Sequence, residues 1–99
     1  MSTLESIIEL RIDTLPNGGY GWNAGFIARP GDCLCHERGL PSFGDCIARA
    51  APSFPDNSLV EVRVDGISAG TWPVHVLHQC ATTVATEVDQ RIGSLITPT

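Results

Sequence analysis

The chain has 99 residues, of which 42% are hydrophobic and 17% are charged, enough for one domain with a buried core. Six arginines, no lysine and eleven acidic residues give a formal net charge of -5, which disfavours direct binding to nucleic-acid phosphates. No signal peptide and no apolar run of membrane-spanning length is recognisable. We therefore expect a cytoplasmic protein that does not contact a membrane and whose four cysteines are free thiols.

The first predicted element is a β-hairpin. Ile8, Leu10 and Ile12 alternate with polar residues, as in a strand that buries one face. Residues 16–19, Pro-Asn-Gly-Gly, supply the turn because Asn and Gly tolerate a positive φ. Residues 20–28 then predict an antiparallel partner strand.

A short strand and a helix are expected next. Residues 33–37 predict the strand, and the break at Gly39-Leu40-Pro41 ends it. Ser42, followed three residues later by Asp45, fits a helix cap in which side chains bind free backbone amides. Pro52 ends this helix, since proline disfavours the α conformation of the residue before it.

A second hairpin organises the other half of the chain. Residues 58–64 alternate at period 2, Asp65-Gly66 is a strong signal for a two-residue turn, and residues 67–72 return as the partner strand. The pairs expected on the core face are Val64 with Ile67, Val62 with Ala69, and Val60 with Thr71. The other face is expected to carry Glu61, Arg63 and Ser68, with Leu59 opposite Trp72 and both covered by the N-terminal half.

The longest predicted helix follows directly. Pro73 suits a first helical position, and apolar residues then recur at steps of three and four, which predicts one helix over residues 73–95. These residues are Leu77, Ala81, Val84, Val88, Ile92 and Leu95.

Together these elements predict an α+β fold in a single domain spanning residues 1–99. We expect an antiparallel sheet of four to five strands, in the order ββ(β)αββα, with two helices packed on one face. The expected core residues are Ile8, Leu10, Ile12, Phe26, Ile47, Val60, Val62, Val64, Ile67, Leu77, Val84, Val88 and Ile92.

The cysteine and histidine residues allow a zinc site as an alternative hypothesis. The alternative zinc ligands are Cys33, Cys35, His78 and Cys80. If residues 73–80 are helical, His78 and Cys80 point about 160° apart and do not share an ion. We favour the helix, and therefore expect no cofactor and buried or partly buried thiols. A zinc-dependent or cysteine-dependent enzyme remains the alternative.

No catalytic constellation stands out, so whether the chain is an enzyme stays open and a binding function is favoured. Large aromatic residues are common anchors of protein interfaces. The residues expected to contact a partner are Trp72, Trp22, Tyr20, Arg63 and Glu61. We expect a non-enzymatic protein-binding module that inhibits or sequesters a macromolecular partner, and pairing with a second copy stays open.

Residues 6–51 carry a family resemblance. Gly18-Gly19-Tyr20, Pro30-Gly31, Cys33, Gly39, Ser42, Asp45 and Ala48-Arg49-Ala50 follow in an order that resembles the N-terminal half of HicB-like antitoxins. The resemblance implies binding to a small toxin ribonuclease. Cys46 stands where that family favours alanine, and the C-terminal half lacks the family's DNA-binding segment. The small size and paired hairpin-helix units also look like phage-encoded inhibitors such as anti-CRISPR proteins, with no shared motif.

Overall fold

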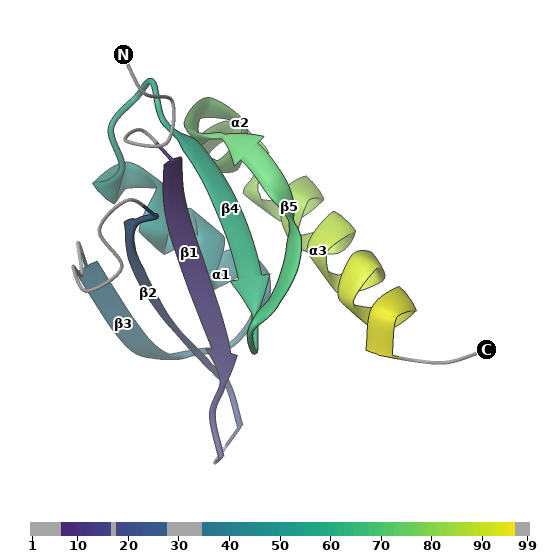
Figure 1. The fold of residues 1–99 in the computed structure, drawn as a ribbon. Helices are drawn as coiled ribbons and strands as arrows, with labels where there is room; N and C mark the ends of the chain where they lie inside the picture. Colours follow the sequence, from purple (N-terminus) through teal and green to yellow (C-terminus); the bar gives the residue numbers. More distant parts are fainter. Residues whose placement is uncertain (1–6, 17, 28–34, 97–99) are drawn as a thin grey trace.

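The computed structural model describes residues 7–16, 18–27 and 35–96. It is an α+β fold in which one five-stranded sheet, in the order β3-β2-β1-β4-β5, is covered by helices on one face (Figure 1). The strands are β1 (Ile7–Thr14), β2 (Tyr20–Phe26), β3 (Cys35–Leu40), β4 (Leu59–Val64) and β5 (Ile67–Pro73), and the helices are α1 (Phe43–Ala50), α2 (Val74–Gln79) and α3 (Ala81–Ile96). The predicted fold class is confirmed. None of the helices in these ranges is long and apolar enough to span a bilayer.

The sheet is mixed, and here the prediction of an antiparallel sheet was wrong. β1 lies parallel to β4, with Leu10 opposite Val62, while the other three strand pairs are antiparallel. Parallel neighbours need a long crossover connection, and the chain from β2 through α1 supplies it. The two predicted hairpins therefore form one sheet, in which their first strands, β1 and β4, are hydrogen-bonded neighbours.

The end of β3 differs from the prediction, whereas the cap of α1 agrees with it. Within the described residues the strand covers 35–40, so it ends three residues beyond the predicted end at residue 37. Gly39, within it, adopts a φ of +80°. Positions 33 and 34 lie outside the described residues. Ser42 caps α1 as predicted: its Oγ accepts a hydrogen bond from the Asp45 amide at 3.2 Å and donates one to the Asp45 carboxylate at 2.9 Å. A short 3-10 helix, Ala51–Ser53, follows α1 directly and contains Pro52.

The cap gives a first testable prediction. Replacing Ser42 with alanine removes the side-chain acceptor for the Asp45 amide, and should lower the free energy of unfolding by about 1 kcal/mol. Urea unfolding followed by circular dichroism measures this change. Ser53→Ala is the matched control, because Ser53 is exposed and caps no helix. An equal loss in both variants would contradict a capping role for Ser42.

The turn between β4 and β5 has the predicted form. Asp65 and Gly66 adopt φ values of +49° and +86°, which suit a two-residue turn of this kind. The Asp65 carboxylate also accepts hydrogen bonds from the backbone amide and the hydroxyl of Thr14, both at 2.9 Å. These bonds tie the turn to the end of β1.

The register of β5 departs from prediction beyond its first pair. Val64 does face Ile67, but Val62 then faces Gly70 and Val60 faces Trp72, because a β-bulge inserts one extra residue at this point. The expected pairings of Val62 and Val60 were therefore wrong. An extra residue reverses the faces of the residues that follow it, so Trp72 lies on the helix side of the sheet.

The predicted C-terminal helix is divided in two. Residues 74–79 are helical as expected, but Cys80 has φ -126° and ψ 38° and ends α2. The break lets the chain change direction before α3 runs along the sheet (Figure 1). The predicted apolar stripe is nevertheless buried at Leu77, Val84, Val88 and Ile92.

The core lies between the sheet and the helices. Eleven of the thirteen predicted core residues are buried, and the other two, Phe26 and Ile67, are half-buried against them. Trp22, Ala24, Cys46 and Phe54 are buried as well. The opposite face of the sheet carries the charged residues of β1 and β4.

Candidate protein-binding surfaces

Two of the predicted partner-binding aromatics face the helices. Trp22 is 2% exposed and belongs to the core, so it is not available to a partner. Tyr20 is half-buried, and its ring lies 4.6 Å from the ring of Phe43. Together these contacts hold α1 against β2.

Trp72 is half-buried at the edge of the sheet and is covered by a cation. The guanidinium carbon of Arg91, on α3, lies 5.1 Å from the centre of the Trp72 ring. Arg91 Nη1 also donates a hydrogen bond of 2.7 Å to the carbonyl of Ala69, the residue at the bulge. A cation over an aromatic ring stabilises both groups, so Arg91 fixes the Trp72 ring and the bulge together.

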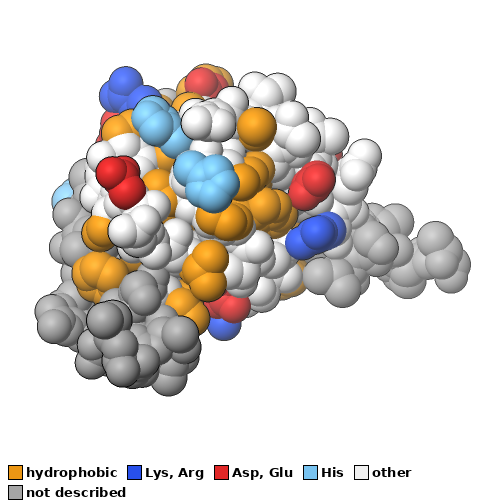
Figure 2. Space-filling view, turned by 90° about the horizontal axis from the view of Figure 1, so that it is seen from above, with side chains coloured by type: hydrophobic (Ala, Val, Ile, Leu, Met, Phe, Trp, Pro, Cys, Tyr) orange, Lys and Arg blue, Asp and Glu red, His pale blue; other side chains and the backbone are white. Residues whose placement is uncertain are grey.

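Apolar side chains gather at the α2 end of the molecule. Leu59 is 43% exposed and stands opposite Pro73 on β5, so the expectation that the N-terminal half covers it was wrong. We call Leu59, Pro73 and Val76 the end surface; apart from Leu59 they are half-buried. The exposed His75 and His78 of α2 border it. Figure 2 views this end, where hydrophobic side chains lie beside histidines and are flanked by charged groups.

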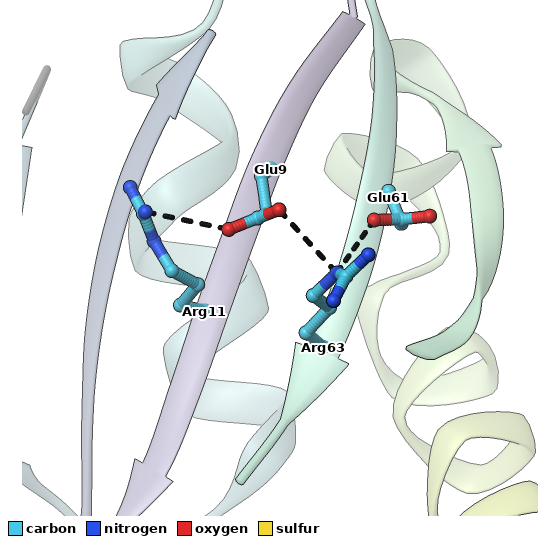
Figure 3. A network of polar contacts seen from close by, with 4 residues as sticks. All are labelled: Glu9, Arg11, Glu61 and Arg63. Atoms are coloured by element: carbon cyan, nitrogen blue, oxygen red, sulfur yellow. Dashed lines mark hydrogen bonds and ion pairs between the residues drawn. The ribbon is translucent and has the colours of Figure 1, made fainter. Parts of the chain in front are cut away.

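The face of the sheet that none of the described helices covers, which we call the uncovered face, carries a chain of charges. Arg63 Nε donates to Glu61 Oε1 at 2.7 Å and lies 3.3 Å from Glu9 Oε2, while Arg11 Nη1 lies 3.3 Å from Glu9 Oε1 (Figure 3). We call Glu9, Arg11, Glu61 and Arg63 the charge quartet. The side chains of these four residues are 21–39% exposed, so the quartet is accessible to solvent.

The described part of the surface includes two shallow hollows. One, of about 450 Å³, lies between the start of α1 and α3 and is lined mainly by small residues such as Gly44, Ala48 and Ala85. The other, of about 460 Å³, lies by the ends of β1, β2 and β3, where Asp13, Asn23 and His36 line it. The second hollow is also lined by Thr14, but the Thr14 hydroxyl donates its hydrogen bond to Asp65, which does not line the hollow, and not to His36.

The alternative zinc ligands are not brought together where they can be located. Cys35 lies on β3, whereas His78 is on α2 and Cys80 follows it; Cys33 lies outside the described residues. Within residues 7–16, 18–27 and 35–96, no three Asp, Glu, His or Cys side chains are placed to hold a metal ion. Residues 74–79 are helical as expected, but Cys80 is not, so the expected angle of about 160° between His78 and Cys80 does not apply to this pair.

Cys46 and Cys80 are thiols in opposite environments. Cys46 lies on the buried side of α1. This burial, together with the charges of Asp45 and Glu37, raises the pKa of its thiol from 9.0 to about 11. Cys80 is exposed at the break between the helices. The thiolate is the reactive form of cysteine, so Cys46 is a packing residue of the core and is unsuited to nucleophilic attack at neutral pH.

These environments predict selective labelling. At pH 8, iodoacetamide should modify Cys80 in the folded protein and leave Cys46 unmodified until the protein unfolds. The folded state favours the neutral Cys46 thiol, so its contribution to stability is complete below pH 9 and declines as the pH rises towards 11. Peptide mass mapping measures the two rates. Equal rates for Cys46 and Cys80 would show that the thiol of α1 is not buried.

Sequence reasoning selected Glu61, Arg63 and Trp72, and the structure places all three on accessible or half-accessible surfaces. It did not select Val76 or Arg91, because their positions depend on the helix break and on the bulge. The exposure of Leu59 and its pairing with Pro73 also depend on tertiary contacts. A scan against protein-family models, a search of curated proteins and a search of solved structures each found no match to this chain.

Proposed function

We propose that this domain is a non-enzymatic protein-binding module that inhibits or sequesters a protein partner through the end surface. The observation that carries the proposal is Leu59, a large apolar side chain that is 43% exposed at the end of a central strand. Its neighbours on the end surface extend the exposed apolar area across β5 and α2.

The composition of the end surface supports this function. Protein interfaces combine an apolar centre that contains aromatic residues with a polar rim, and they are enriched in Trp and Arg. Here Leu59, Pro73 and Val76 supply the apolar centre, and the exposed His75 and His78 of α2 are polar groups at its border.

A comparative capture experiment tests the proposal. The tagged wild-type protein and the Leu59→Asp variant are incubated with lysate of the native host, and bound proteins are quantified by mass spectrometry. We expect at least one protein to be retained by the wild type and lost from Leu59→Asp, because a buried carboxylate opposes an apolar contact. Binding of the purified partner should weaken at least about tenfold.

The control places the same charge elsewhere. Thr83 is exposed on α3, so Thr83→Asp changes the net charge equally without altering the end surface. Both variants should unfold cooperatively, because neither residue is buried. A partner that binds the wild type and Leu59→Asp equally would contradict the assignment of this surface.

A toxin-binding role is the second candidate. It is supported by residues 7–50, where β1, β2, β3 and the Ser42-capped α1 follow in the order that the antitoxin resemblance implies. Under this proposal the partner is a small ribonuclease encoded beside this protein. Co-expression should relieve the growth arrest that such a neighbour causes, and unrelieved arrest would remove this candidate.

A further inference from the structure

We infer that two copies of this chain pair face to face through the uncovered side of the sheet, with the charge quartet at the centre of the contact. The inference rests on the arrangement of the quartet. Leu59 of the end surface lies on the same face of β4 as Glu61 and Arg63, at the margin of this contact. The occupant of this sheet face is therefore a second copy of the same domain.

The quartet consists of two rows of like charge. In the parallel register of β1 and β4, Glu9 stands beside Glu61, and Arg11 stands beside Arg63. Like charges directly opposite each other on neighbouring strands are unfavourable. Ion pairs from Arg63 to Glu9 and along each strand join these charges within one copy, and all four side chains stay partly exposed and so can contact a second copy.

A two-fold axis makes these rows complementary to themselves. If the axis lies between the two sheets, midway between the rows and at right angles to the strands, it places the acidic row of one copy over the basic row of the other. Glu61 then faces Arg63 of the second copy, and Glu9 faces its Arg11. A closed dimer of this kind uses the same patch on both subunits.

The available area suits a weak dimer. Five strands spaced about 4.8 Å apart, with about six residues each at a rise of about 3.3 Å, present roughly 24 by 20 Å on each copy. The two faces together cover about 1,000 Å², near the lower limit for a specific interface. Since the centre is charged, we expect a reversible dimer that weakens with salt.

Sedimentation velocity of the wild-type protein is the first test. We expect a dimer to be populated at high protein concentration in 50 mM salt, and to dissociate in 1 M salt as charge interactions are screened. A monomer under all these conditions would overturn the inference.

Two charge reversals then identify the surface. Glu61→Arg places like charges opposite Arg63 of the second copy, and Arg63→Glu places like charges opposite Glu61. Each variant alone should raise the dimer dissociation constant at least about tenfold. Mixed together, the two variants present opposite charges at both positions and should form a heterodimer, which native mass spectrometry resolves by mass.

Thr83→Arg is the matched control, since it adds a positive charge on α3, away from the sheet. It should dimerise as the wild type does. A wild-type dimer that survives both reversals, or reversed variants that fail to pair when mixed, would show that the sheet face is not the interface. Circular dichroism confirms that each variant is folded, which is expected because positions 61 and 63 are only partly buried.

Discussion

A chain in which Val62 is replaced by aspartate should not fold. Val62 is fully buried near the middle of β4, between Leu10 of β1 and Gly70 of β5. An ionised carboxylate at this position would have no partner, and protonation to avoid the charge would still leave polar atoms in the apolar core. The expected loss exceeds about 4 kcal/mol, a large part of the stability of a domain of this size.

Thermal unfolding followed by circular dichroism measures this effect. Ser68→Asp is the matched control, because Ser68 is exposed on β5 and stands opposite Arg63. It should melt within a few degrees of the wild type. A Val62→Asp protein with a cooperative transition would mean that the faces of β4 are assigned incorrectly.

Gly70→Ala has the second largest expected effect. Gly70 has a φ of +133°, a backbone conformation that side chains oppose, and an added Cβ would collide with the guanidinium of Arg91. Arg91 would then have to leave the Trp72 ring and the Ala69 carbonyl. Strain and lost contacts together should lower the free energy of unfolding by about 2–4 kcal/mol.

The same substitution at Gly93 provides a matched control. Gly93 lies on α3, where an added Cβ would meet no atom within 4 Å, so Gly93→Ala should leave stability unchanged or raise it by up to about 1 kcal/mol. The Arg91→Ala variant separates the two causes. In that background Gly70→Ala should cost less, since the collision with Arg91 is absent while the backbone strain and the 3.2 Å approach to Trp72 Cη2 remain. An unchanged cost would assign the whole effect to the backbone and Trp72.

Local features of the fold could be read from the sequence because neighbouring residues determine them. The period-2 pattern of residues 8–12 and 60–64 indicates which side chains are buried, whatever strand lies alongside. Asp65-Gly66 forms its turn and Ser42 caps its helix through contacts within a few residues. The helical periodicity likewise identified the buried stripe of α3.

Less of the candidate site could be predicted from the sequence. Glu61 and Arg63 were placed correctly on the uncovered face, since alternation alone decides their side. The prediction for Trp72 and its partner strand was wrong in register, because a β-bulge at Ala69, beside Gly70, shifts the pairing by one residue. Trp22 was selected for its residue type, which does not distinguish an interface anchor from a core residue.

By itself, the sequence determined the α+β class, the two hairpin turns, the helix cap and the buried faces of β1, β4 and α3. Only the tertiary structure decided that β1 and β4 are parallel neighbours, that the last helix breaks at Cys80, and that Leu59 stays exposed while Trp22 is buried. The division has a physical cause. Turns, caps and periodicity depend on contacts between residues close in the chain, whereas strand neighbours and exposure depend on contacts between distant segments, which local patterns do not specify.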